Sequence, residues 1–188
     1  MPSLSDNDRQ SLLHLARLAI TEAVSRGQIL ADIPAGGIFS EQRGVFVTLH
    51  IGERLRGCLG VVEPEHPLGD SIVRCAIGAA MRDPRFPVLR SHELSHLQIE
   101  ISLLSEPCPI RPEEIEIGGH GLLIVQGNHR GLLLPQVAVT HQLTSQQFLA
   151  EACRKAQLAP EAWRDSGTKL LSFTCEVFST AAASQHLK

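Results

Sequence analysis

The sequence is poor in aromatic residues, carries no excess of basic charge and contains no long apolar run. Its 188 residues include no tyrosine and one tryptophan, and 4% are aromatic, so few flat side chains are present on which nucleic-acid bases stack. Seventeen Lys and Arg against 20 Asp and Glu give a formal net charge of -3, which disfavours nucleic acid as a partner. The apolar runs stay far below the roughly 20 residues of a membrane span, so no membrane association is expected.

Disulfide and zinc chemistry also lack their usual sequence patterns. The five cysteines are odd in number and form no CxxC pair, which predicts neither a disulfide framework nor a zinc knuckle. His14 and Arg17 interrupt the first leucine-rich stretch, so we expect no secretion leader. Together these features predict a reduced, cytoplasmic protein.

What is present is the composition and patterning of a single domain over residues 1–188. Hydrophobic residues make up 43% of the chain, enough for a sizeable core. Helical spacing of apolar residues predicts three helices, over 5–26, 68–81 and 144–156. Ser5 and Thr144 are the expected capping residues of the first and third. Two-residue alternation predicts strands over 44–51, 54–60, 98–104, 122–125, 131–134 and 170–178, followed by a polar tail over 179–188.

Cys58 has the clearest chemical setting of the five cysteines. Alternation along the strand places Leu55 and Leu59 on one face and Arg54, Arg56 and Cys58 on the other. Neighbouring arginines favour the reactive thiolate, and Gly57 lets a ligand approach the backbone. The alternative is that Cys58 is a small packing residue, as free cysteines usually are. Cys75, Cys153 and Cys175 fall on apolar faces and are interpreted as core residues.

Three charged residues and one histidine are further candidates for the site. Asp83, Arg85 and Glu100 can supply an acid or base and an anion clamp if their strand faces converge with Cys58. Equally, Asp83 and Arg85 can satisfy a tight turn, with Glu100 pairing an arginine on the sheet. His120 lies between glycines and can reach a ligand, although this glycine run lacks the spacing of a nucleotide-binding loop.

The segment from His92 to His96 is a literal HExxH match. Zinc proteases need this motif on a helix long enough to present both histidines on one face, with Glu93 as the base. Pro87 upstream and a strand from Gln98 leave room for a turn or two of helix at most. We therefore predict no metal site and no cofactor, and we interpret both histidines as solvated.

Several segments, taken together, resemble the AMMECR domain family in order and spacing. The most specific is the LRGC-[IL]-G signature, present as Leu55 to Gly60, and the likeness runs from the first helix to Phe178. The family's prokaryotic members are known as AmmeMemoRadiSam system protein A. The other matching segments are Arg82 to Phe86, Ile99 to Pro107, Gly118 to Leu122 and Gly131 to Val137.

The resemblance implies an α+β fold of two lobes, each an antiparallel sheet with flanking helices, separated by a cleft. The larger lobe would come from both terminal regions and the smaller from the middle, with the LRGC segment facing the cleft. It also implies a Memo-type protein and a radical S-adenosylmethionine enzyme as partners, but no reaction. The sequence departs from the family pattern at Thr140 and Leu143, where an acidic residue and a Trp are usual, and at Gln157, where Gly is usual.

Two functions remain open at this point. The leading interpretation is a thiol-dependent enzyme that acts in the cleft on an unknown small ligand, with Cys58, Glu100 and His120 as catalytic residues. Its expected binding residues are Arg56, Gly57, Asp83, Arg85 and Gln136. The alternative is a non-catalytic adaptor or ligand-binding module for the same two partners, so the sequence leaves open whether the protein is an enzyme.

Overall fold

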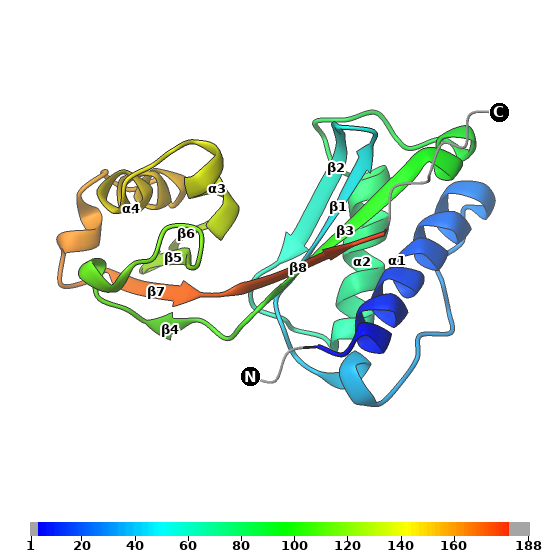
Figure 1. The fold of residues 1–188 in the computed structure, drawn as a ribbon, viewed down its shortest axis with the longest axis horizontal. Helices are drawn as coiled ribbons and strands as arrows, with labels where there is room; N and C mark the ends of the chain where they lie inside the picture. Colours follow the sequence, from blue (N-terminus) through cyan, green and yellow to red (C-terminus); the bar gives the residue numbers. More distant parts are fainter. Residues whose placement is uncertain (1–3, 181–188) are drawn as a thin grey trace. The chain divides into compact units, whose positions relative to one another are not determined.

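The computed structural model describes residues 4–180, and these form two compact units (Figure 1). Unit 1 consists of the described residues up to Leu103 and from Val177 onward, and unit 2 is Leu104–Glu176. The units contain two four-stranded antiparallel sheets and flanking helices, which confirms the α+β fold class. The cleft stays a prediction. No helix within the described range has the length and apolar character needed to cross a membrane.

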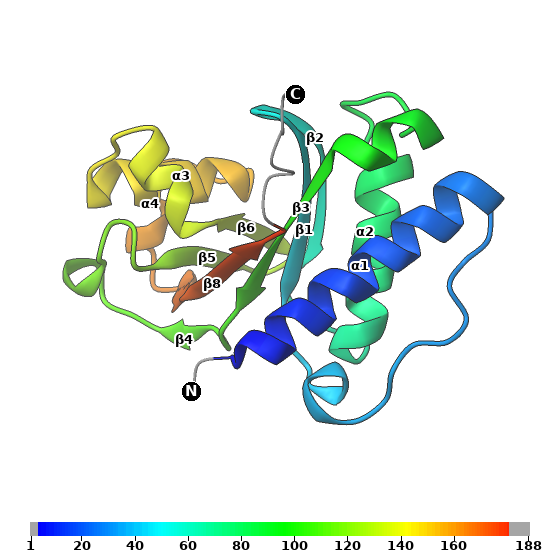
Figure 2. The same ribbon diagram turned by 45° about the vertical axis from the view of Figure 1, so that its right-hand side comes forward.

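The first sheet has the strand order β2-β1-β3-β8 and belongs mainly to unit 1. Its strands are β1 (Val45–Ile51), β2 (Arg54–Val61), β3 (Leu97–Leu104) and β8 (Cys175–Ser179). The helices of this unit are α1 (Asp6–Arg26) and α2 (Leu68–Met81), with the short 3-10 helices η1 (Gly37–Ser40) and η2 (Ser91–His96). Figure 2 shows α1 and α2 on the same face of the sheet.

The second sheet has the order β4-β7-β5-β6 and belongs to unit 2. Its strands are β4 (Cys108–Pro109), β5 (Gly121–Gln126), β6 (His129–Leu133) and β7 (Lys169–Phe173). The helices are α3 (Pro135–Thr140) and α4 (Ser145–Lys155), with 3-10 helices η3 (Pro112–Glu114) and η4 (Ala162–Arg164). The core of this unit is built around the fully buried Phe148 of α4, which packs with Leu122 and Ile124 of β5.

Both predicted capping residues begin their helices. The hydroxyl of Ser5 accepts a hydrogen bond from the Asp8 amide, and the Thr144 hydroxyl accepts one from the Gln147 amide. Each satisfies an amide that the first helical turn leaves without an intrahelical partner. Gly27 ends α1 with a φ of 64°, a left-handed backbone that glycine adopts without strain.

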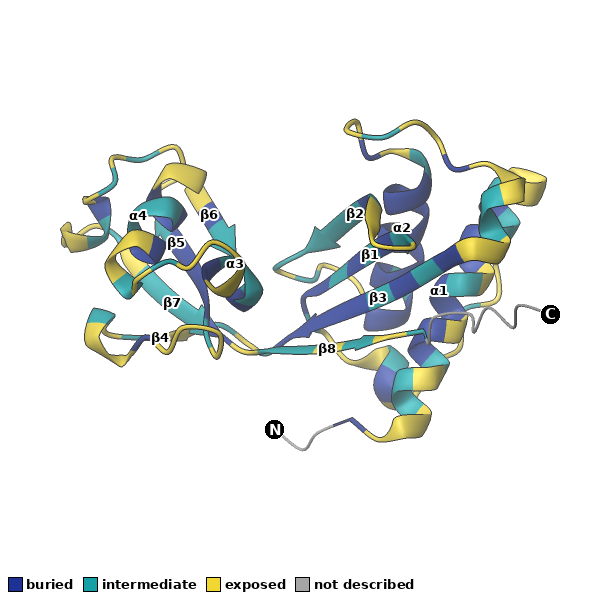
Figure 3. Ribbon diagram, turned by 45° about the horizontal axis from the view of Figure 1, so that its top comes forward, coloured by how far each residue is buried: buried dark blue, intermediate teal, exposed yellow. Residues whose placement is uncertain are grey.

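One face of the first sheet packs on the two helices. Val45, Val47 and Leu49 of β1 are fully buried, as are the alternate β3 residues Ile99, Ile101 and Leu103. Figure 3 shows the same alternation as buried and intermediate segments along these strands. The residues between them therefore point to the opposite face, away from α1 and α2.

A β-bulge in β2 corrects the predicted strand faces. Leu49 pairs with Gly57 but His50 pairs with Leu55, so Arg56 has no partner and the alternation shifts there. Leu55 therefore shares the face of Cys58, and Arg54, which pairs with Ile51, shares the helix-facing side. The predicted faces of Leu55 and Arg54 are wrong, because strict alternation allows no extra residue.

Two further differences concern the ends of the chain's elements. The single strand predicted over 170–178 is two strands, β7 and β8, interrupted at Thr174. Ser179 still belongs to β8, and the Thr180 amide donates to the Ile99 carbonyl, so these two residues are not part of a free tail. The rest of the predicted tail lies outside the described residues. The short helix α3 was not predicted, since its six residues are too few to show a helical period.

Candidate functional site

A row of three side chains crosses the face of the first sheet opposite the helices. Thr48 of β1 is the cross-strand partner both of Cys58 in β2 and of Glu100 in β3. All three are half-buried. We call Cys58, Thr48 and Glu100 the thiol row. The structure thus brings together two of the predicted catalytic residues, with Thr48 between them.

The Cys58 sulfur has a hydroxyl donor. The Thr48 Oγ1 atom lies 3.3 Å from the Cys58 Sγ atom and donates to it. A donor at this position stabilises the negative charge that sulfur carries when it acts as a nucleophile or metal ligand. The sequence alone does not indicate Thr48, because the hairpin turn at Gly52 would place it opposite Gly57, and only the bulge in β2 shifts its partner to Cys58.

Glu100 does not reach the sulfur directly. Neighbouring strands in a sheet lie about 4.8 Å apart, so β2 and β3 on either side of β1 are separated by about 10 Å. The Glu100 carboxylate and the Cys58 thiol therefore lie at the two ends of the thiol row. A ligand lying over Thr48 can contact both groups.

Asp83 and Arg85 bind the backbone of Cys58 rather than its sulfur. The Asp83 carboxylate accepts a hydrogen bond of 2.9 Å from the Cys58 amide, and the Arg85 guanidinium donates to the Cys58 carbonyl over 3.4 Å. Arg85 also pairs with Asp83 at 2.7 Å. The Asp83 side chain is only 3% exposed, and the guanidinium beside it lowers the pKa of the carboxyl well below its usual range. Together they fix the outer edge of β2 at Cys58.

Arg56 is engaged away from the thiol. Its guanidinium donates to the Glu93 carboxylate over 2.8 Å and to the carbonyls of Pro87 and Val88. The Arg56 and Glu93 side chains are 13% and 18% exposed, so water screens this pair only in part. The hydrogen bond from Arg56 lowers the pKa of Glu93. Arg56 therefore ties η2 and the segment before it to β2. Its role as a ligand-binding residue stays a prediction.

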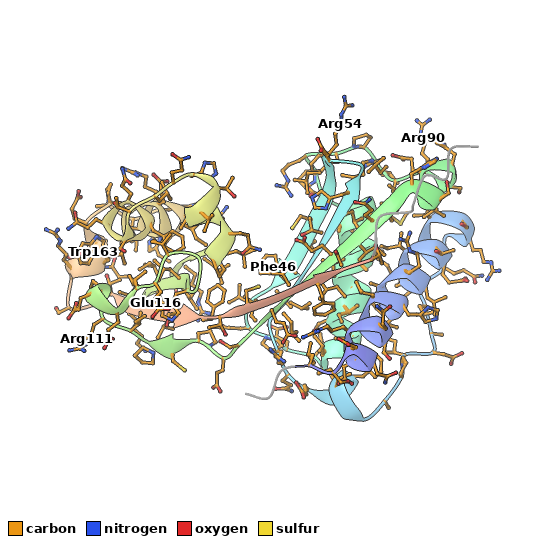
Figure 4. The ribbon with its side chains drawn as sticks, in the orientation of Figure 1. Phe46, Arg54, Arg90, Arg111, Glu116 and Trp163 are labelled. Atoms are coloured by element: carbon orange, nitrogen blue, oxygen red, sulfur yellow. The ribbon has the colours of Figure 1, made fainter. Side chains whose placement is uncertain are left out.

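The two glycines of the LRGC-[IL]-G segment allow close packing on opposite faces. A Cβ atom on the buried Gly57 would lie 2.0 Å from the Ala79 carbonyl oxygen of α2. A Cβ atom on Gly60 would lie 2.2 Å from the ring of Phe46, labelled in Figure 4. The close approach predicted for a ligand at Gly57 is thus made by α2, because the residue faces the helix.

His120 and Gln136 belong to unit 2. The His120 Nδ1 atom accepts a hydrogen bond from the Glu116 amide over 3.2 Å, which orients its ring within the turn before β5. Gln136 lies in the first turn of α3, directly after Pro135 in the sequence. Both side chains are half-buried. Their assignment to a site with Cys58 stays a prediction.

The HExxH segment forms the 3-10 helix η2. With about three residues per turn, such a helix turns side chains four positions apart to different sides. His92 and His96 are exposed, and the Glu93 carboxylate between them accepts from the Arg90 amide and from Arg56. Nowhere in residues 4–180 do three His, Cys, Asp or Glu side chains lie close enough to hold a metal ion. The Arg56–Glu93 pair was not found from the sequence, because 37 residues separate its members.

The other cysteines differ clearly in exposure. Cys75 and Cys153 are buried, and burial raises the pKa of both thiols, that of Cys75 to about 11. They are core residues, as predicted. Cys175 is half-buried rather than part of the core, since it lies at the start of β8. Cys108 is exposed and is a natural reference thiol for Cys58.

Comparisons with known proteins agree with the fold and motifs. The AMMECR1 family model matches residues 13–178. A protein of Thermococcus gammatolerans is 41% identical over 95% of this chain and 93% of its own length, and Protein PF1979 of Pyrococcus furiosus is 40% identical over 95% and 90%. The crystal structure of the uncharacterized protein PH0010 from Pyrococcus horikoshii is similar with a TM-score of 0.87 and 37% identity, over 95% of this chain and 94% of that one. The chain belongs to the AMMECR1 family.

Proposed function

We propose that the protein is a cytoplasmic, thiol-dependent enzyme that acts on a small ligand lying along the thiol row. The observation that carries this proposal is the hydrogen bond from Thr48 to the Cys58 sulfur, on a half-buried thiol whose backbone Asp83 and Arg85 hold in place. Nucleophilic attack needs a sulfur atom that is held in place with a hydrogen-bond donor beside it, whereas a cysteine that only fills space needs neither. Its partners would be a Memo-type protein and a radical S-adenosylmethionine enzyme, as family membership suggests.

In the proposed step the Cys58 thiol releases its proton to solvent. The sulfur lone pair then forms a bond to an electrophilic carbon of the ligand, and the leaving group departs with its bonding electron pair. Glu100, at the far end of the thiol row, orients a polar group of the ligand.

Alkylation resolved by site tests the nucleophile. Iodoacetamide forms a sulfur–carbon bond at each accessible thiol and releases iodide, and mass spectrometry of peptides gives separate rates for Cys58 and the exposed Cys108. We expect Thr48→Val, which keeps the β-branched shape and removes the hydroxyl, to lower the Cys58 rate several-fold and leave Cys108 unchanged. Thr48→Ser should restore the rate. A Cys58 rate that is the same with and without the hydroxyl overturns the proposal.

A second function is favoured by a different observation. Charged side chains in and around the LRGC segment form ion pairs within the protein, Arg56 with Glu93 and Arg85 with Asp83. These pairs make the LRGC segment a rigid surface. A rigid surface also suits an adaptor for the two partners. Binding of a purified Memo-type protein from the same genome, measured together with function in the cell, separates the two. In Cys58→Ser an adaptor keeps both the binding and the function, whereas a thiol-dependent enzyme keeps the binding and loses the function.

A further inference from the structure

A pocket of about 490 Å³ lies in unit 1 where β2 faces α2. Its lining strand residues, Leu59 and Val61, point to the side opposite the Cys58 sulfur, so the pocket is separate from the thiol row. Gly78 and the buried Cys75 of α2 complete an apolar floor. This volume lies within the range of sites that hold a small molecule or one or two side chains of a bound chain.

The outer edge of β2 beside this pocket is open to pairing. β2 is the end strand of its sheet, so it has a neighbour on one side only. At Cys58 the outward amide and carbonyl are taken by Asp83 and Arg85. Because outward groups recur every second residue, Gly60 presents its amide and carbonyl on the same side. Among residues 4–180 no group bonds to these two atoms of Gly60.

The rim of the pocket carries charges of both signs. Arg74 and Arg82 come from α2 and its C-terminal end, and neither guanidinium has a carboxylate partner within residues 4–180. Glu63, Glu65 and His66 come from the segment that connects β2 to α2. Nucleic acids and anionic membranes require one dominant positive sign, which this rim lacks. A polypeptide fits all three features of the groove. Its backbone can pair with the strand edge, its apolar side chains can fill the floor, and its charges of either sign can match the rim.

We propose that this groove binds an extended peptide segment of a partner protein. The segment pairs with β2 at Gly60 as a short added strand and places an apolar side chain against Leu59 and Val61. Recognition of this kind takes affinity from main-chain hydrogen bonds at a sheet edge and specificity from pockets for alternate side chains. The inference does not depend on the reactivity of Cys58.

Peptide selection tests the groove with a matched pair of variants. A displayed library of random heptapeptides is selected on the full chain, and the enriched peptides are measured against Gly78→Ala and Gly167→Ala. The methyl group added at Gly78 would lie 2.7 Å from a terminal carbon of Leu59 and push this side chain into the pocket, while a Cβ at Gly167 meets nothing. We expect enriched peptides that share an apolar position and bind Gly78→Ala about tenfold more weakly, equivalent to about 1.4 kcal/mol, with Gly167→Ala unchanged.

Amide hydrogen exchange in the presence of an enriched peptide tests the pairing itself. Protection of the Gly60 amide should rise, because it gains a partner, while the Cys58 amide, already bonded to Asp83, should change little. Three results overturn the proposal: no peptide is enriched, enriched peptides bind Gly78→Ala as well as the unchanged chain, or binding leaves the Gly60 amide exchanging as before. The last result would assign the pocket to a side chain or small molecule without strand pairing.

Discussion

Gln157 occupies a position where the backbone favours glycine. It follows α4 with a φ of 60°, its amide donates to the Arg154 carbonyl, and the Leu158 amide donates to the Cys153 carbonyl. This pair of hydrogen bonds defines a Schellman motif, whose left-handed residue is usually glycine. Gln157 therefore carries a local backbone cost, because a residue with a Cβ atom adopts the left-handed conformation less readily than glycine does.

Gln157→Gly is expected to stabilise the protein by about 1 kcal/mol, because glycine adopts the left-handed region without a Cβ clash. Gln146→Gly is the matched control, since Gln146 is an exposed residue within α4. Glycine there should destabilise, because it loses more conformational entropy in a right-handed helical turn than a residue with a Cβ atom. Urea unfolding of both variants measures the difference, and a loss of stability in Gln157→Gly contradicts the assignment.

The stability that Asp83 contributes to the fold around Cys58 depends on pH. Its folded pKa is depressed, so its contribution to stability is fully present above the unfolded value near 3.8 and is lost as the pH falls toward the lower folded value. Asp83→Asn removes the charge that Arg85 binds and should cost about 2 kcal/mol at pH 7. The difference between the unchanged chain and Asp83→Asn should shrink below pH 4. Urea unfolding at pH 7 and at pH 3 checks this, and a constant difference would count against the Asp83–Arg85 contact.

At the scale of elements, local patterns predicted the helices better than the edges of the sheets. The capping residues Ser5 and Thr144 and the bounds of α2 were confirmed, since caps and apolar spacing are local signals. The bulge at Arg56 was missed because it depends on how β1 pairs with β2. For the site, too, only the local part was predictable. Strand alternation gave the shared face of Cys58 and Glu100. The contacts of Arg56 and Gly57 are with segments distant in the sequence, which no local pattern indicates.

The two glycines of β2 should respond differently to added methyl groups. In Gly57→Ala the obstacle is the backbone of Ala79, which cannot move without α2, so we expect a loss of about 3 kcal/mol. In Gly60→Ala the obstacle is the Phe46 ring, and removing the ring by Phe46→Ala should relieve the clash. A double-mutant cycle on unfolding free energy gives the coupling. Additive effects of Gly60→Ala and Phe46→Ala would contradict the packing described for this face.

At the scale of the whole molecule, each unit has its own hydrophobic core. The cluster around α1, α2 and β1 contains none of the residues that pack around Phe148. The chain passes between the units twice, through β3 and β8, so the two cores are joined by strands rather than by a single linker. Separate cores predict separate cooperative unfolding units, because burial of apolar area is the main source of stability in each.

Phe148→Ala tests this division. Removing a fully buried phenylalanine leaves a cavity and should cost the core of unit 2 about 4 kcal/mol. Amides of β5 and β7, which pair in unit 2, should then exchange faster, while those of β1 in unit 1 keep their protection. Val47→Ala in β1 is the reciprocal variant, since Val47 is fully buried in the other core. If either substitution accelerates exchange equally in β1 and β5, the strands β3 and β8 couple the two cores into one cooperative unit, and the thiol row and unit 2 then unfold together.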